Sequence, residues 1–153
     1  EPETTDLAPL VDGVLADLAP QAAERGSVVV RAGHSGPVSA VVDPAQIRVA
    51  VHALVRNAME ATGHGGRIEV ELGADDAYAE IRVADNGPGI AEDDRRHIFE
   101  PFFSARQAGR GLGMGLSKCW RIVTAHGGRI EVDHRPGGGA VFVVRLPRRG
   151  GEQ

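Results

Sequence analysis

The sequence predicts an α+β domain, a two-layer sandwich in which one mostly antiparallel, mixed β-sheet carries its helices on one face. Segments that alternate apolar and polar residues come in neighbouring pairs, and helical patterns separate the pairs. This order is typical of helices packed on one side of a sheet. A length of 153 residues suits one domain with a single core.

The first predicted helix covers residues 6–25, where leucine and valine recur at helical spacing. Pro9 fits a first helical turn, whereas Pro20 is expected to kink or end the helix, and Gly26 stops the pattern. The segments SVVVRA (27–32) and VSAVVD (38–43) then predict two strands around a glycine-containing loop.

The second predicted helix runs from Asp43 to about Thr62. Asp43 is a suitable N-cap, Pro44 occupies the first helical position, and Gln46 completes a pattern like a capping box. At 100° per residue one face is expected to point to the core. Its members are Ile47, Val51, Leu54, Val55, Ala58 and Thr62.

The second half of the chain predicts two strand pairs and one further helix. The alternating segments are RIEVEL (67–72), AEIRVAD (79–85), RIEVDH (129–134) and AVFVVRL (140–146). The last two are expected to form a hairpin through RPGGG. A helix over about 114–126 ends at Gly127 and Gly128, and residues 86–115 have little regular pattern.

Composition excludes several classes of function. The net charge of −4 and the absence of a basic stripe argue against nucleic-acid binding. No apolar run approaches the ~18 residues of a membrane span, so we expect no membrane contact by this domain. The single cysteine, Cys119, excludes an internal disulfide and suits a reducing, cytoplasmic compartment. A start at Glu1 rather than Met suggests a domain cut from a longer protein.

The stretch GRGLGMGLSKCW (109–120) places glycine at every second position before a helix. Each glycine costs about 1 kcal/mol in a helix relative to alanine, which suggests that something approaches the backbone closely. The spacing fits neither the dinucleotide fingerprint nor the P-loop. Backbone N–H groups and a helix N-terminus still suit an anion. A flexible surface loop is an equally good interpretation of this stretch alone.

A second glycine cluster, ADNGPGI (84–90), follows a predicted strand. Asp85 would project where the strand gives way to a turn, and Gly87 and Gly89 leave room for a flat group. A carboxylate there can accept a hydrogen bond from an exocyclic amine such as that of adenine. The alternative is an ordinary Asp-Asn-Gly-Pro turn.

Asn57 lies beside the apolar face of the second helix, in a stripe formed by Ala50, Ala53 and Ala61. Asparagine is mildly unfavourable inside a helix, and small neighbours let another group pack closely. An amide oxygen is a suitable ligand for Mg²⁺, which uses few protein ligands together with phosphates. A solvated asparagine is the alternative.

These motifs occur in the order Asn57, DNGPG, IFEPFFSAR and GRGLGMGLS, and this order resembles the ATP-binding catalytic domain of sensor histidine kinases in the GHKL superfamily. The resemblance covers nearly the whole chain, from Asp6 to Leu146. It implies the Bergerat fold, with ATP and Mg²⁺ as cofactors. It also implies one catalytic domain over residues 1–153, with a core over about 6–146 and an ATP lid over about 91–110.

The resemblance also implies roles for individual residues. Asn57 matches the Mg²⁺-coordinating asparagine, and Asp85 matches the acid that binds the adenine amino group. Arg106 stands near the basic residue of the lid, where a γ-phosphate contact is implied, so Asn57 and Arg106 are the catalytic candidates. The other implied nucleotide-contacting residues belong to the two glycine boxes and the aromatic box: Gly87, Gly89, Ile90, Phe99, Phe103, Gly111, Leu112, Gly113, Gly115 and Leu116.

Arg56, Lys118 and His52 are weaker candidates. The charges of Arg56 and Lys118 are expected to be solvated, and His52 is expected to face water.

Two features depart from the family pattern. The position four residues before Asn57 carries Ala53, where ATPase relatives have a glutamate that activates water, and alanine cannot accept a proton. None of the six histidines stands in the sequence context of a phospho-acceptor. The dimerisation and acceptor domain is therefore expected to lie upstream of Glu1.

The resemblance implies a kinase module that binds ATP or ADP and donates the γ-phosphate to a histidine on a separate dimerisation domain, with a response regulator downstream. A membrane anchor elsewhere in the full-length parent is compatible with this cytoplasmic domain. A nucleotide-binding regulatory module without kinase activity, which Ala53 favours, and an anti-sigma-type serine kinase are the alternatives.

Overall fold

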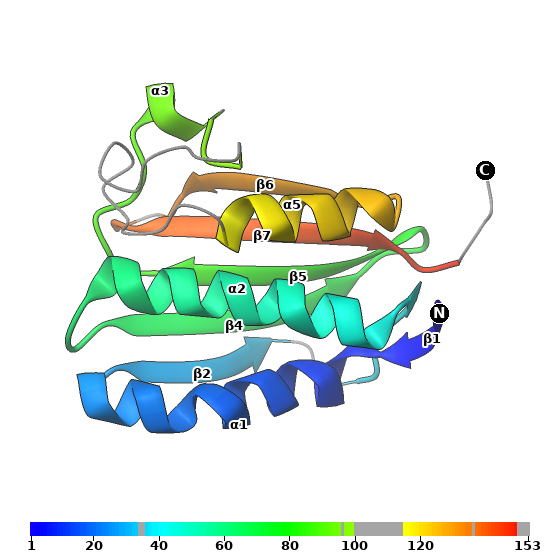
Figure 1. Ribbon diagram of the computed structural model, residues 1–153, viewed down its shortest axis with the longest axis horizontal. Helices are drawn as coiled ribbons and strands as arrows, with labels where there is room; N and C mark the ends of the chain where they lie inside the picture. Colours follow the sequence, from blue (N-terminus) through cyan, green and yellow to red (C-terminus); the bar gives the residue numbers. More distant parts are fainter. Residues whose placement is uncertain (34–35, 96, 100–114, 136, 150–153) are drawn as a thin grey trace.

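The computed structural model describes residues 1–33, 36–95, 97–99, 115–135 and 137–149 and shows two layers, with α1, α2 and α5 on one face of a five-stranded sheet (Figure 1). The elements are β1 (Glu3–Asp6), α1 (Leu7–Arg25), β2 (Val28–Gly33), β3 (Ser39–Val42), α2 (Pro44–Thr62), β4 (Arg67–Ala74), β5 (Tyr78–Asp85), α3 (Glu92–Arg95), α5 (Gly115–Ala125), β6 (Arg129–His134) and β7 (Ala140–Pro147). The predicted fold class is confirmed.

The large sheet has the order β2-β4-β5-β7-β6, and only its edge pair β2–β4 is parallel. The strands β2 and β3 flank one loop, as predicted, but they belong to different sheets. β3 pairs instead with β1, a four-residue strand that the sequence did not predict. The segment ETTD has no apolar alternation, so its pairing with β3 is a tertiary effect that a local pattern does not carry.

Helix α1 begins and ends where the sequence predicted. The Asp6 carboxylate accepts a hydrogen bond from the N–H of Ala8 at 3.2 Å, and Gly26 adopts a left-handed conformation with φ of 66°. Pro20 does not end the helix, which continues to Arg25. The flanking residues Leu18 and Ala22 are buried against the core, and this packing outweighs the one hydrogen bond that proline removes.

Helix α2 has the predicted N-cap. Asp43 Oδ1 accepts from the N–H groups of Ala45 at 3.0 Å and Gln46 at 3.2 Å. The core face is broader than predicted, since it also includes Ala50, Asn57 and Met59. Thr62, which was predicted to belong to this face, is only half-buried. The buried residues of α2 are Ile47, Ala50, Val51, Leu54, Val55, Asn57, Ala58 and Met59.

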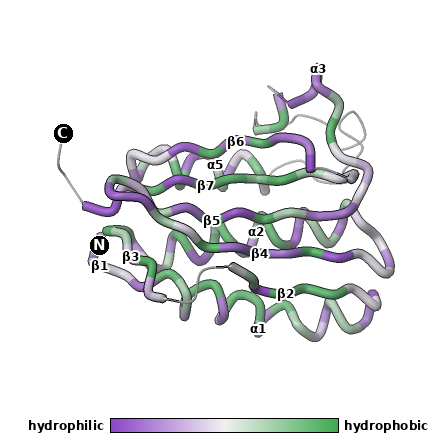
Figure 2. Tube along the Cα trace, turned by 180° about the vertical axis from the view of Figure 1, so that it is seen from behind, coloured by the Kyte–Doolittle hydropathy of each residue, from purple (hydrophilic) through white to green (hydrophobic). Residues whose placement is uncertain are grey.

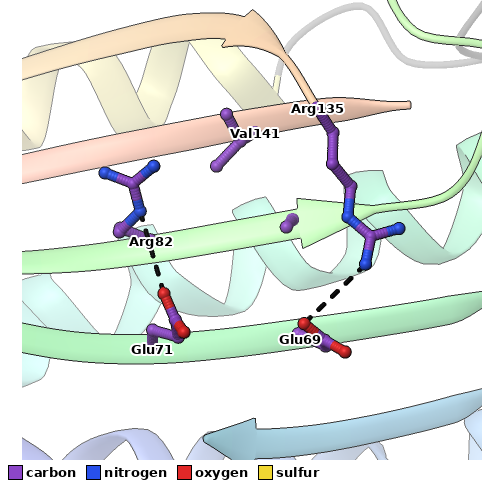
Figure 3. Close-up of a pocket in the computed structure, with 6 residues that line it drawn as sticks. Glu69, Glu71, Arg82, Arg135 and Val141 are labelled. Atoms are coloured by element: carbon purple, nitrogen blue, oxygen red, sulfur yellow. Dashed lines mark ion pairs between the residues drawn. The ribbon is translucent and has the colours of Figure 1, made fainter. Parts of the chain in front are cut away.

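The two faces of the sheet differ in chemistry. Residues that alternate along β4, β5 and β7 point to the helices and form the core, and Figure 2 shows hydrophilic and hydrophobic residues following one another along these strands. The opposite face carries paired charges. Figure 3 shows Arg82 with Glu71 at 3.9 Å and Arg135 with Glu69 at 3.7 Å, around a shallow pocket. Charged pairs of this kind keep an open sheet face solvated.

In the part of the chain that the structure describes, every helix is too short or too polar to cross a bilayer.

Candidate nucleotide-binding site

Asp85 is the last residue of β5, and its side chain is fully buried. Its Oδ1 atom accepts hydrogen bonds from the backbone N–H groups of Gly87 at 3.0 Å and Ala140 at 3.4 Å. The first bond closes the turn that follows β5, and the second reaches the start of β7. The carboxylate is therefore held in one orientation by two backbone segments that are far apart in sequence.

Asn86 fixes the same turn to the neighbouring strand. Its Oδ1 atom accepts from the N–H of Arg67 at 2.9 Å, and its own N–H donates to the Arg67 carbonyl at 3.3 Å. Arg67 is the first residue of β4, so Asn86 continues the β4–β5 ladder by one step through its side chain. Sequence reasoning treated Asn86 only as part of a turn and missed this role.

Gly87 and Gly89 let two other elements approach the turn. A Cβ on Gly87 would lie 3.2 Å from the carbonyl oxygen of Ala61 in α2, and a Cβ on Gly89 would lie 3.1 Å from that of Gly139. Gly89 also has a φ of 80°, which residues other than glycine rarely adopt. Backbone fills these two directions, so the side-chain space of the glycines is not open to a flat group as expected. The glycines instead let α2 and the β6–β7 loop pack against the turn.

Gly139 is a site residue that the sequence reasoning assigned only to a hairpin. Its φ is 104°, and a Cβ there would collide with the carbonyl oxygen of Asp85. The next residue, Ala140, donates its N–H to the Asp85 carboxylate. The contact joins residues more than fifty positions apart, so a local pattern carries no signal for it beyond the unusual GGG run.

Asn57 lies at the same end of the molecule as Asp85. It is one helical turn before Ala61, whose carbonyl oxygen faces Gly87. The residue is completely buried, so the interpretation as a solvated asparagine is wrong. Within the predicted alanine stripe, Ala50 is buried, and Ala53 and Ala61 are half-buried.

His52 is half-buried rather than facing water. Burial lowers the pKa of its imidazole, and the nearby Arg56 lowers it further. Arg56 itself is exposed and lies 3.5 Å from Glu60, one turn along α2, and Lys118 is exposed. The positions of Arg56 and Lys118 agree with the interpretation of both as surface charges.

Two apolar residues and one aromatic residue anchor the segment that leaves the site. Ile90 and Ile98 are buried, and the Phe99 ring packs edge-on against Phe142 of β7 at 6.1 Å between ring centres. Between them, residues 92–95 form the short helix α3, which the sequence did not predict.

The glycine-rich stretch enters the described structure at Gly115, the first residue of α5, followed by buried Leu116. The remaining candidates from the lid and the second glycine box lie outside the described residues: Phe103, Arg106, Gly111, Leu112 and Gly113. The described residues contain no cluster of three or more His, Cys, Asp or Glu side chains that could hold a metal ion.

Comparison with known proteins gives a consistent result. Residues 42–150 match the family described as histidine kinase-, DNA gyrase B-, and HSP90-like ATPase. The sequence is 41% identical over 115 residues to the signal transduction histidine-protein kinase AfsQ2 of Streptomyces coelicolor, a match that covers 72% of this chain and 21% of AfsQ2.

Solved structures agree with the sequence match. The nucleotide-free catalytic domain of histidine kinase ThkA has a TM-score of 0.88 at 28% identity, with 97% of this chain and 98% of that chain covered. ThkA in complex with the response regulator TrrA matches with a TM-score of 0.87 at 25% identity, over 99% of this chain and 43% of that one. Full-length ShkA in complex with AMPPNP matches at 28% identity with a TM-score of 0.85, over all of this chain and 32% of ShkA.

The chain spans about a fifth of the length of AfsQ2, so the match concerns one domain of a longer relative. The family match covers more than half of the chain, and both the relative and the structural neighbours are histidine kinases. This chain therefore belongs to the histidine kinase-, DNA gyrase B- and HSP90-like ATPase family, as an ATP-binding catalytic domain of the histidine kinase type.

Proposed function

We propose that this chain binds Mg-ATP and donates its γ-phosphate to a histidine on a separate dimerisation domain of the same protein, as part of a sensor histidine kinase. The observation that carries the proposal is the buried Asp85 carboxylate, held by the backbone N–H groups of Gly87 and Ala140 beside the C-terminal half of α2. A fixed, buried acceptor is suited to one specific polar partner rather than to solvent.

Asp85 is the proposed adenine-recognition residue. A carboxylate offers about four lone-pair sites on its two oxygens, and two backbone N–H groups occupy Oδ1. The exocyclic amine of adenine is a donor and complements such a group. Guanine presents a carbonyl oxygen at the equivalent position, which would face the carboxylate acceptor to acceptor. The site is therefore expected to select adenine nucleotides.

Asn57 is the proposed magnesium ligand. The described residues offer no carboxylate-rich metal cluster, and Mg²⁺ commonly uses one or two protein oxygens together with substrate phosphates. The amide of Asn57 is buried one helical turn before Ala61, whose carbonyl oxygen faces Gly87. This amide fits such a ligand set. When bound, the ion supplies neutralisation of phosphate charge.

The proposed phosphate contacts come from the glycine-rich stretch that ends at Gly115, where α5 presents the positive end of its dipole. Gly111 and Gly113 contribute backbone N–H groups, Leu112 and Leu116 flank them, and Arg106 reaches the γ-phosphate. Phe99 and Phe103 anchor a lid over about 91–110. These roles complete a single ATP-binding domain over residues 1–153.

Catalysis by this domain is proposed to be positioning and charge stabilisation, without a covalent step on its own residues. The attacking histidine comes from the acceptor domain. Ala53 cannot act as a general base, so the domain alone is not equipped to activate water. A response regulator is the proposed recipient downstream, and the cytoplasm is the proposed location of the domain.

Calorimetric titration of the chain with Mg-ATP, ADP and Mg-GTP tests the proposal. We expect one site for ATP and ADP and at least tenfold weaker binding of GTP, because guanine lacks the exocyclic amine donor at the position that faces Asp85. Equal affinity for ATP and GTP would contradict the role of Asp85. The absence of any nucleotide binding by a folded chain would overturn the function.

A further inference from the structure

A histidine at the end of the molecule opposite Asp85 joins the two helices of the proposed site. His126 follows α5 directly, and its ring lies between two backbone groups. Nδ1 lies 2.8 Å from the carbonyl oxygen of Ile122, one turn earlier in α5, and Nε2 lies 3.1 Å from the backbone nitrogen of Asp43 at the start of α2.

These two partners determine where a neutral ring carries its proton. The Asp43 N–H can only donate, so Nε2 must be the unprotonated acceptor. The Ile122 carbonyl can only accept, so Nδ1 must carry the hydrogen. The hydrogen bond at one ring nitrogen fixes the state of the other. A doubly protonated ring would place two donors, Nε2–H and the Asp43 N–H, against each other.

The backbone presents this ring in an ordered helix end. The His126 N–H donates to the carbonyls of Ile122 at 3.2 Å and Val123 at 3.1 Å, and the Gly128 N–H also reaches Val123 at 3.0 Å. Gly127 has a φ of 76°, as in left-handed helix terminators. The position of the ring is therefore set by α5 and not by a loose loop.

Asp43 has two functions at this contact. Its carboxylate caps α2 through Ala45 and Gln46, while its own N–H donates to His126. Asp43 thus caps the start of α2 and also donates a hydrogen bond to the residue that follows α5. A displacement of α5 along α2 would break this bond.

Helices α2 and α5 lie side by side and run in opposite directions (Figure 1). Asn57 lies roughly 20 Å along α2 from Asp43, and Gly115 lies roughly 16 Å along α5 from His126, at a rise of 1.5 Å per residue. Asn57 and Gly115, the positions assigned to the metal and the phosphates, therefore both lie toward the far end of the helix pair from the His126–Asp43 contact. A slip by one helical turn would move them apart by about 5.4 Å.

We propose that His126, as the Nδ1-protonated tautomer, is a positioning residue for nucleotide binding. It fixes α5 against the N-terminus of α2 and thereby sets the spacing between Asn57 and the start of α5. The functional half of this inference rests on the proposed function, whereas the tautomer and the helix contact do not.

The first test is nitrogen-15 NMR of the His126 ring in the unmodified chain. We expect a pyrrole-like Nδ1 and a pyridine-like Nε2, with Nε2 coupled to the Asp43 amide hydrogen. Free histidine favours the other tautomer, so the expected spectrum differs from that of the exposed His64 in the same sample. An Nε2-protonated or rapidly exchanging ring at neutral pH would overturn the inference.

The second test compares two variants that each keep one hydrogen bond. His126→Asn retains a donor for Ile122 and loses the acceptor for Asp43, whereas His126→Gln places an amide oxygen near the position of Nε2. We expect His126→Asn to weaken Mg-ATP binding about tenfold and to change metal-free ADP binding less than threefold. His126→Gln should restore Mg-ATP binding to within threefold of the original chain, and His64→Asn serves as the surface control.

The possible results separate this inference from the proposed function. Unchanged Mg-ATP affinity in a folded His126→Asn variant, or equal losses for Mg-ATP and ADP, would overturn the positioning role. An unmodified chain that shows the Nδ1-protonated tautomer but binds no adenine nucleotide would overturn the proposed function, and the positioning role with it. The NMR test on the unmodified chain applies even where a variant does not fold.

Discussion

Replacement of Asp85 by asparagine changes the chemistry of the site while preserving its shape. The asparagine Oδ1 can still accept from the N–H groups of Gly87 and Ala140, so the turn after β5 is retained. The second carboxylate oxygen becomes an NH₂ donor. In the proposed complex this donor faces the adenine amine, so a charge-assisted hydrogen bond is lost and a buried donor is left unsatisfied.

The expected magnitude follows from these two losses. A hydrogen bond to a charged group contributes about 1.5–3 kcal/mol, and an unsatisfied buried group costs about 1–3 kcal/mol. We therefore expect a loss of about 3 kcal/mol or more for Asp85→Asn, which weakens ADP and Mg-ATP binding by at least about a hundredfold. Because both backbone hydrogen bonds can persist, the variant should still fold.

Asp75 offers a matched control at the other end of β5. Its Oδ1 atom also accepts two backbone N–H groups, from Ala77 at 2.9 Å and Tyr78 at 2.8 Å, but it is exposed and away from the site. Asp75→Asn should leave nucleotide affinity unchanged by calorimetry, with circular dichroism melts to confirm folding of both variants. An Asp85→Asn chain that is folded and binds ATP within threefold of the original would refute the reasoning.

Three further predictions address the metal ligand, the loop behind Asp85 and the buried thiol. Asn57→Ala should weaken Mg-ATP binding more than metal-free ADP binding, and equal losses by calorimetry would mean that Asn57 is not a ligand. Gly139→Ala and Gly138→Ala both force alanine to a positive φ, at about 1–3 kcal/mol each. Only Gly139→Ala should add a collision with Asp85 and lower the melting temperature further. Equal melting temperatures of the two variants would contradict this contact. Burial raises the pKa of Cys119 to about 12, so a disulfide reagent at pH 8 should label this thiol only after unfolding. The free energy of unfolding should fall as the pH rises above the ordinary thiol pKa, because the unfolded chain then loses the proton that the folded chain keeps. Fast labelling of the native chain would argue against burial.

Local sequence patterns predicted the parts of the fold that local physics determines. The cap at Asp43, the stop at Gly26 and the alternation of β4 and β5 all involve neighbours within a few residues, and the structure agrees with them. The pairing of β1 with β3 was missed because ETTD has no strand signal of its own, and Pro20 was given too much weight against the packing of α1.

The site shows the same division. Asp85 and Asn57 could be singled out because a carboxylate at a glycine turn and an amide in an alanine stripe are unusual locally. Gly139 and Ala140 could not, since their roles arise only when the β6–β7 hairpin returns to Asp85. His126 was likewise set aside for want of an acceptor context, although its ring bridges two helices whose sequence separation hides the contact.

The most direct test of the proposed phosphotransfer uses ATP labelled at the γ-phosphate, this chain, and the dimerisation and acceptor domain of its parent protein. We expect no labelling and negligible phosphate release by the chain alone. Addition of the acceptor domain should give label on that domain's histidine that is acid-labile and base-stable, and the transfer should be lost with Asp85→Asn. Rapid phosphate release by the chain alone would indicate a self-sufficient ATPase, and tight ATP binding without transfer to the matched acceptor would indicate a regulatory module; either result would contradict the account.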